Sequence, residues 1–115
     1  MPQPSDRTVQ YPSGDTETIP VTAAGTMAAE VKNSETIIEI TEMSAPGTLN
    51  LTVNDAVRKG SNLTVKAISD GTGRTLTFGT GMVGVAFAIT ASKTAVFSFK
   101  HDGTDFVNTS AILIN

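Results

Sequence analysis

Few residues in this chain have the chemistry that catalysis needs, and the most versatile of them is its single histidine, His101. Proton transfer in enzymes relies on positioned His, Glu, Asp, Lys, Tyr or Cys side chains, but this chain has one Tyr and no Cys. No serine lies in the Gly-X-Ser-X-Gly pattern that marks a nucleophile for a histidine such as His101 to activate. Without Cys there are no disulfides, thiolate metal ligands or thiol nucleophiles. We therefore predict a protein that is not an enzyme, with no catalytic residues and no cofactor.

Glycines and aspartates gather in the second half of the chain. The glycines of this group are Gly71, Gly73, Gly79, Gly81 and Gly84. A phosphate-binding loop would need a helix that begins with Lys-Ser or Lys-Thr after the glycines, whereas residues 75–78 predict a strand. Asp70, Asp102 and Asp105 do not have the spacing of an EF-hand loop, and turns account for them. We expect turns at these positions and no metal site.

The composition indicates a single β domain. Of the 115 residues, 39% are hydrophobic and 17% are charged, and this length corresponds to one domain. Thr is frequent in the second half, and Thr favours strands over helices. The net charge of -3 and the lack of a basic cluster argue against a nucleic-acid partner. No apolar run approaches the roughly 20 residues of a membrane span, and residues 1–10 lack the apolar stretch of a secretory signal, so we expect no membrane partner.

Short strands separated by turn residues are expected from residue 18 onward, the pattern of a β-sandwich or barrel. The expected strands cover residues 18–23, 36–42, 48–54, 62–69, 74–79, 83–90, 94–101 and 105–113. Alternation is clear where Leu49, Leu51 and Val53 share one face, which predicts one packed face. Residues 26–32 fit either a helical turn or a strand. The predicted fold is all-β, a single antiparallel β-sandwich that is jelly-roll-like and covers residues 18–115.

The first 17 residues differ from the rest and predict an extended N-terminal arm. Four of the five prolines lie within the first twenty residues, and proline fixes φ and donates no backbone hydrogen bond. Such an arm can attach to a partner through main-chain contacts and a few apolar anchors, for which we expect Val9, Tyr11 and Ile19. The alternatives are a tail with no role in binding and an arm that folds back on its own or a neighbouring subunit.

Two segments lack alternation and predict a subunit interface. Residues 83–89 and 111–114 are apolar on both faces, and strands of that kind are buried on both sides. In a chain this small the second side would be another subunit, because contiguous exposed apolar surface marks interfaces. The expected interface residues are Val83, Val85, Phe87, Ile112, Leu113 and Ile114.

Asp-Gly pairs predict two β-hairpin turns. Asp70, Gly71 and Gly73 separate two alternating strands, and Asp102 and Gly103 do the same further along the chain. Gly is favoured in such turns because it adopts positive φ without a steric cost. We therefore expect positive φ at Gly71 and at Gly103.

The segments around these turns resemble a β module of structural proteins of tailed bacteriophages. The resembling segments read DGTGRTLTFG over residues 70–79, VFSFKHDGTDF over residues 96–106 and GSNLTV over residues 60–65. The resemblance extends over about residues 48–110. It departs from the module at His101, where Tyr is usual, and at Phe106, where Trp is frequent. Both departures preserve the turn but weaken an inference of an aromatic carbohydrate site.

The resemblance implies a virion structural protein that acts by binding. Modules of this kind occur in capsid decoration proteins, head fibres and tail-fibre-associated proteins, frequently as trimers. The small size of the chain favours a capsid decoration or head-fibre protein, which would be located in the virion on the capsid surface. Its expected partners are its own copies in a homotrimer and the major capsid protein or another virion protein. The alternative is a host-surface module of a phage tail or head fibre that binds glycans.

Overall fold

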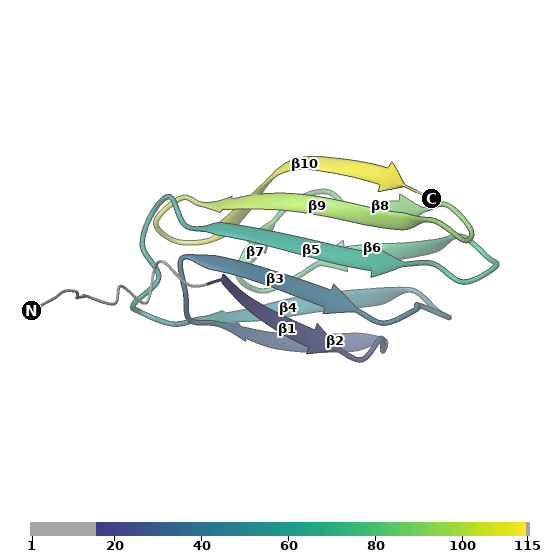
Figure 1. Ribbon diagram of the computed structural model, residues 1–115, viewed down its shortest axis with the longest axis horizontal. Coiled ribbons are helices and arrows are strands. Elements are labelled where there is room, and N and C mark those ends of the chain that lie inside the picture. Colours follow the sequence, from purple (N-terminus) through teal and green to yellow (C-terminus); the bar gives the residue numbers. More distant parts are fainter. Residues whose placement is uncertain (1–15, 115) are drawn as a thin grey trace, which may run out of the picture.

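Ten strands make up the part of the protein that the structure describes. The computed structural model describes residues 16–114 (Figure 1), so the expected arm anchors Val9 and Tyr11 lie outside the described residues. The strands are β1 (Thr16–Val21), β2 (Thr26–Val31), β3 (Glu35–Ile40), β4 (Gly47–Val53), β5 (Asn62–Ile68), β6 (Arg74–Phe78), β7 (Met82–Val83), β8 (Phe87–Ile89), β9 (Thr94–His101) and β10 (Phe106–Ile114). Residues 16–114 contain no helix, and so none that is long and apolar enough to cross a membrane.

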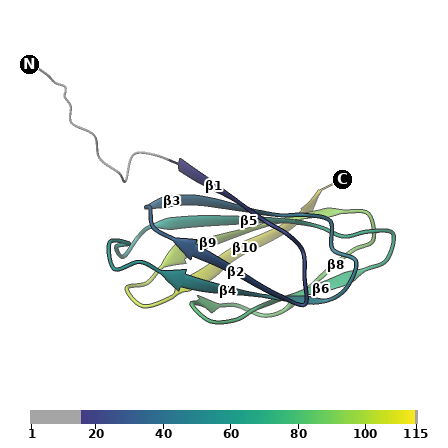
Figure 2. The same cartoon turned by 90° about the horizontal axis from the view of Figure 1, so that it is seen from below.

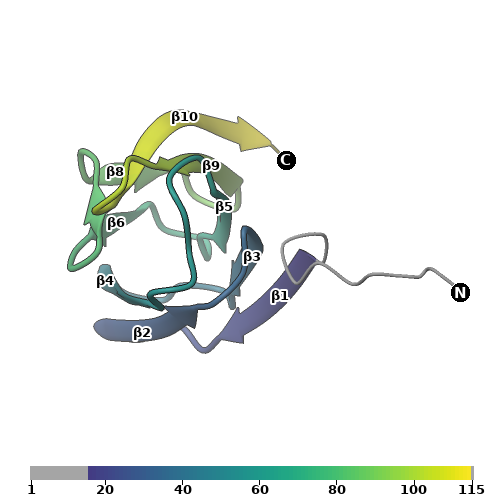
Figure 3. The same cartoon turned by 90° about the vertical axis from the view of Figure 1, so that its left-hand side faces the viewer.

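The strands form two sheets that lie face to face (Figure 2, Figure 3). The larger sheet has the order β1-β3-β5-β9-β10-β7, and the smaller sheet has the order β2-β4-β6-β8. Up to β6, the chain passes from one sheet to the other after every strand. β1, β3 and β5 are therefore parallel neighbours, as are β2, β4 and β6. The first six strands wind as a flattened parallel coil.

The last four strands close this coil mostly in the antiparallel sense. β8 pairs with β6, β9 with β5 and β10 with β9, all antiparallel. Among the described residues, β7 is the only strand on the far side of β10, and it pairs only with Phe106 and Val107. The rest of β10 is thus a free sheet edge within residues 16–114.

The all-β fold with two packed sheets is confirmed, but the expectation that the sandwich is antiparallel and jelly-roll-like is wrong. Five of the eight strand pairings are parallel. Alternation of apolar and polar residues tells which face of a strand is packed, but not the direction of the neighbouring strand. Parallel neighbours require a crossover connection, and in this fold a strand of the opposite sheet serves as the crossover.

Most expected strands occur close to their expected positions, with one exception. Seven of the eight have both ends within two residues of the prediction. Residues 26–32, which fitted either a helical turn or a strand, contain strand β2, and Met27 and Val31 are buried at strand spacing. The expected strand 83–90 is wrong, because residues 84–86 separate β7 from β8. A Cβ at Gly84 would lie 3.1 Å from the Cβ of Asn108, so the chain leaves the strand path where it passes close to β10.

β1 is an edge strand of the larger sheet, and it overlaps the end of the expected arm. Ile19 was expected to be an attachment residue of the arm, but it belongs to β1 and packs against the core. The predicted boundary between residues 17 and 18 therefore falls inside a strand. Pro20 also lies in β1, which an edge strand tolerates because its outer side donates no ladder hydrogen bonds.

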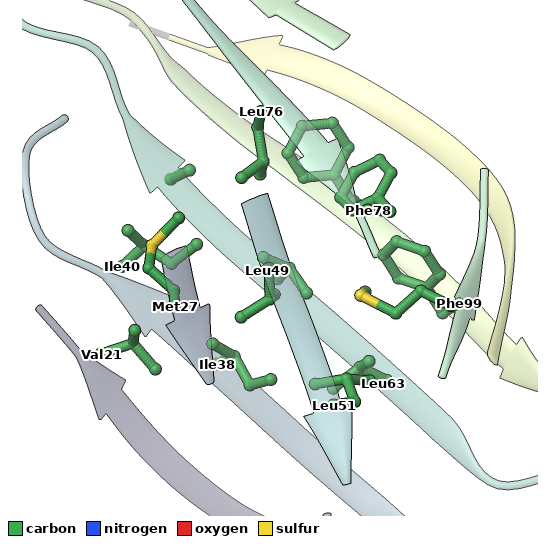
Figure 4. Packing of buried hydrophobic residues seen from close by; sticks show 14 of the residues in the cluster. Val21, Met27, Ile38, Ile40, Leu49, Leu51, Leu63, Leu76, Phe78 and Phe99 are labelled. Atoms are coloured by element: carbon green, nitrogen blue, oxygen red, sulfur yellow. The ribbon is translucent and has the colours of Figure 1, made fainter. Parts of the chain in front are cut away.

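Apolar side chains from both sheets fill the space between them (Figure 4). Leu49 of the smaller sheet and Leu63 of the larger sheet are almost fully buried. The ring of Phe78 packs edge to face against Phe97 and Phe99, with centroid distances of 5.1 and 5.0 Å. Aromatic pairs in this geometry stabilise a core beyond the area that they bury. This core fixes the positions of β9 and β10, which carry the candidate site.

Candidate association surface

Six large aliphatic side chains are exposed on the described surface. They are Ile68, Val83, Val85, Ile112, Leu113 and Ile114. Ile68, Ile112, Leu113 and Ile114 lie at one end of the larger sheet. At this end Thr94 of β9 pairs with Ile114 of β10 on one side and with Ile68 of β5 on the other. We call this group, formed by Ile68, Ile112, Leu113 and Ile114, the β10 patch.

Both faces of β10 contribute to the β10 patch. Ile112 and Ile114 lie opposite Val96 and Thr94 of β9, on the outer face of the larger sheet. Leu113 lies opposite Ala95, which is fully buried, and so it faces the inside. Leu113 is nevertheless 39% exposed, since the facing sheet ends at the three-residue strand β8. Apolar side chains therefore flank the free edge of β10 on both sides.

The structure brings together only some of the six predicted interface residues. Ile112, Leu113 and Ile114 lie in the β10 patch, whereas Val83 pairs with Val107 near the other end of β10. Val85 is 86% exposed and lies between β7 and β8.

Phe87, the sixth predicted interface residue, contributes mainly to the core. Its ring packs edge to face on Phe97, with a centroid distance of 5.2 Å, and the side chain is only partly exposed. Ile68 is the member of the β10 patch that the sequence analysis missed. It follows the buried Ala67 and so falls on the polar face of β5. The alternation of apolar and polar residues in this strand could therefore have predicted that Ile68 is exposed.

A shallow groove adjoins the β10 patch on the outer face of the larger sheet. It has a volume of about 230 Å³ and is lined by Glu39, Ile40, Lys66, Ile68 and Thr94. The Nζ of Lys66 lies 3.7 Å from the Oε2 of Glu39, and both side chains are about half exposed. An ion pair this exposed contributes little to stability. Ile68 makes the groove continuous with the β10 patch.

The turn between β9 and β10 is the hairpin that the sequence predicts. The Oδ1 atom of Asp102 accepts hydrogen bonds from the backbone N–H groups of Thr104 and Asp105, both at 2.8 Å. Gly103 has the expected positive φ, at 105°. The hydrogen bonds from Asp105 and then Thr104 lower the pKa of the Asp102 carboxyl below its ordinary value.

The turn after β5 contains a side-chain ion pair. The Nε and Nη2 atoms of Arg74 donate hydrogen bonds to the two carboxylate oxygens of Asp70, each at 2.9 Å. The backbone N–H of Thr72 donates a third, at 3.0 Å. The hydrogen bond from Arg74, followed by that from Thr72, lowers the pKa of Asp70.

This turn is not a hairpin, so the prediction for Asp70, Gly71 and Gly73 is wrong. It connects β5 of the larger sheet to β6 of the smaller sheet. Gly71 does not have positive φ. The primed turns that require positive φ reverse a chain between paired strands, and no such reversal occurs here.

His101 lies at the end of β9, next to the Asp102-Gly103 turn, as the sequence predicts. It is 5% exposed, its Nδ1 accepts a hydrogen bond from the N–H of Gly103 at 3.2 Å, and its ring packs on Phe106 with a centroid distance of 4.9 Å. Its Nε2 is buried without a partner among the described residues. These contacts support the turn and the core. Within residues 16–114, no group of three or more His, Cys, Asp and Glu side chains gathers at a possible metal site.

No protein-family model matches the chain, and no curated protein matches it. Among the described residues, the β10 patch is the feature that most directly indicates binding.

The two Asp-Gly turns allow a direct test of backbone strain. Gly103→Val should lower the free energy of unfolding by about 1–3 kcal/mol, because a β-branched residue is strained at positive φ. Gly71→Val should have a much smaller effect, since Gly71 does not have positive φ. An added Cβ meets no atom within 4 Å at either position, so the pair compares backbone strain alone. Urea unfolding measures both changes, and equal losses would contradict this account of the turns.

The same turns predict how stability depends on pH. Asp70 and Asp102 both have pKa values below the ordinary 3.8. A carboxyl with a lowered folded-state pKa stabilises the fold above its unfolded-state pKa, and this stabilisation is lost as pH falls through the folded-state pKa. Below about pH 5, Tm should therefore fall less steeply for an Asp70→Asn, Asp102→Asn double variant than for the wild type. Asp55→Asn, at an exposed residue outside both turns, is the control and should keep the wild-type slope.

Proposed function

We propose that this protein is a bacteriophage virion structural protein, a capsid decoration or head-fibre protein that binds and stabilises the capsid surface. The resemblance of residues 48–110 to phage structural modules supports the virion part of the proposal. The observation that carries the binding part is the β10 patch, an apolar surface exposed at a sheet edge. Contiguous exposed apolar side chains are typical of surfaces that contact another protein.

Stabilisation of a capsid requires only binding, without a chemical step. A protein that binds the assembled shell and not its free subunits adds its binding free energy to the stability of the shell. In this proposal residues 1–15 form the attachment arm, with Val9 and Tyr11 as its apolar anchors. Ile19 no longer belongs to this set, since it packs against the core. Several linked copies would bind much more firmly than one.

Deletion of residues 2–15 tests the arm without removing any part of β1. The truncated protein should keep the β-sheet circular dichroism spectrum and the Tm of the full chain, but it should no longer bind purified capsids that lack the protein. A Val9→Ala, Tyr11→Ala variant keeps the length of the arm and should also bind less. Binding equal to that of the full chain would move the attachment surface to the β domain.

The location of the protein in a purified virion tests the function itself. Immunogold labelling or cryo-electron microscopy should place it on the outer surface of the capsid, and added protein should raise the temperature at which capsids come apart. Absence from the virion would overturn the proposed function, whatever the result of the arm deletion.

Within residues 16–114, no exposed aromatic ring favours the glycan-binding alternative. A ring that stacks on a sugar must expose one face, but all five phenylalanines lie in the core or pack against it. A glycan array with the full chain tests this alternative directly, and specific binding on the array would support it over capsid stabilisation.

A further inference from the structure

The edges of the two sheets differ in how well they are protected against adding a further strand. Unpaired N–H and C=O groups at an edge recruit another strand unless the edge is short or carries charges or proline. β1 carries Glu17 and Pro20, and β2 carries Glu30. β7 and β8 are only two and three residues long.

β10 lacks most of these protections. It is nine residues long and contains no charged residue and no proline. A β-bulge interrupts its pairing between Asn108 and Ser110, but residues 110–114 pair in regular register with β9. Among the described strands only β7 covers its far side, and only at Phe106 and Val107. The free part of the edge contains Ile112, Leu113 and Ile114 of the β10 patch, so both backbone groups and apolar side chains are available there.

We propose that the free edge of β10 is a self-association surface, on which β10 of a second copy pairs antiparallel across a two-fold axis. The two larger sheets would then form one continuous sheet. A two-fold contact uses the same residues on both copies, so the strand must be complementary to itself.

The sequence of β10 meets this requirement. Ile112, Leu113 and Ile114 read the same in both directions. An antiparallel pairing centred on Leu113 places each Ile112 opposite Ile114 of the partner subunit, on the outer face. It also places the two Leu113 side chains opposite each other on the inner side. Like charges directly opposite each other would destabilise such a pair of strands. β10 contains no charged residue, so this repulsion does not arise.

This inference does not depend on the proposed virion function, and it differs from the homotrimer that the resemblance implies. Two identical edges that pair with each other close a dimer, and no edge is left for a third copy at the same contact. A trimer is therefore an outcome of the test, and one that would overturn the proposal.

The mass of the full chain in solution is the first test. Sedimentation or light scattering at micromolar concentration should give twice the 11.9 kDa of one chain. Leu113→Lys places two like charges opposite each other and should weaken dimerisation at least tenfold, so that the same measurement gives the mass of one chain. Val85→Lys is the matched control, because Val85 is also an exposed aliphatic residue but lies outside β10. It should leave the dimer intact.

A cross-linking experiment tests the register independently of these charges. The chain has no Cys, so Leu113→Cys introduces a single thiol. With oxidised glutathione as oxidant, this variant should form a disulfide-linked dimer many times faster than Val85→Cys. A monomeric wild type, a mass of three chains, equal effects of the two lysine variants or equal cross-linking of the two cysteine variants would each overturn the proposal.

Discussion

Replacing Phe97 by alanine should lower the free energy of unfolding by about 3–5 kcal/mol, a large part of the stability of a domain this size. Phe97 is fully buried, and its ring packs edge to face against Phe78 and Phe87, at 5.1 and 5.2 Å. The substitution removes the transfer free energy of the ring and leaves a cavity between the sheets that the surrounding strands can only partly fill.

Urea unfolding of the wild type and Phe97→Ala measures this loss. Val96→Ala is the matched control, since Val96 is the preceding residue of β9 and lies on the outer face of the sheet. It should cost no more than about 1 kcal/mol. Similar losses for the two variants would mean that Phe97 does not have the central position in the core described above.

Gly81→Ala should lower the free energy of unfolding by about 2–4 kcal/mol, for two reasons that act together. Gly81 has a φ of 80°, a backbone conformation that costs an L-residue free energy. In addition, an added Cβ would lie 2.9 Å from the backbone oxygen of Leu51, which cannot move without disturbing β4. The carbonyl of Gly81 also accepts a hydrogen bond from the N–H of Phe106 at 2.9 Å, so a local shift would disturb the start of β10 as well.

Gly60→Ala separates these two contributions. Gly60 has a φ of 94°, but no atom lies within 4 Å of the position of its Cβ. Its substitution should therefore show the backbone cost alone, about 1–2 kcal/mol. If both alanine variants lose the same free energy, the close approach of Gly81 to Leu51 contributes nothing.

The packed faces of the strands could be predicted from the sequence, because burial in a sheet has a period of two. Leu49, Leu51 and Leu63 are buried as their alternation predicts. The parallel winding could not be predicted in this way, since a strand that crosses to the other sheet has the same alternation as one that turns back. The turn at Asp70 shows the difficulty, because its residues suit a hairpin but the chain passes to the other sheet.

The candidate surface was predicted in part, for a related reason. The loss of alternation over residues 111–114 predicted apolar side chains that a single chain does not bury on both faces. Ile112, Leu113 and Ile114 are indeed exposed. Over residues 83–89 the expected continuous strand is wrong, because a loop at residues 84–86 separates β7 from β8, although Val83 and Val85 are exposed as well. Gly84 lies in that loop, and a Cβ at this position would lie 3.1 Å from the Cβ of Asn108, so close approach to β10 favours glycine there.

The parallel coil of the first six strands also has a consequence for the rate of folding. Thr16 pairs with Glu35, and Glu35 pairs with Asn62. Each of these pairings therefore requires the closure of a long loop before the strand can join the sheet. The β9–β10 hairpin is local and can form in about 1–10 μs, whereas domains dominated by distant pairings fold in roughly milliseconds to seconds. During that interval the hairpin presents the unprotected edge of β10 before the rest of the sheet is assembled. Refolding at low protein concentration should therefore give the highest yield, because premature pairing between chains is then least frequent.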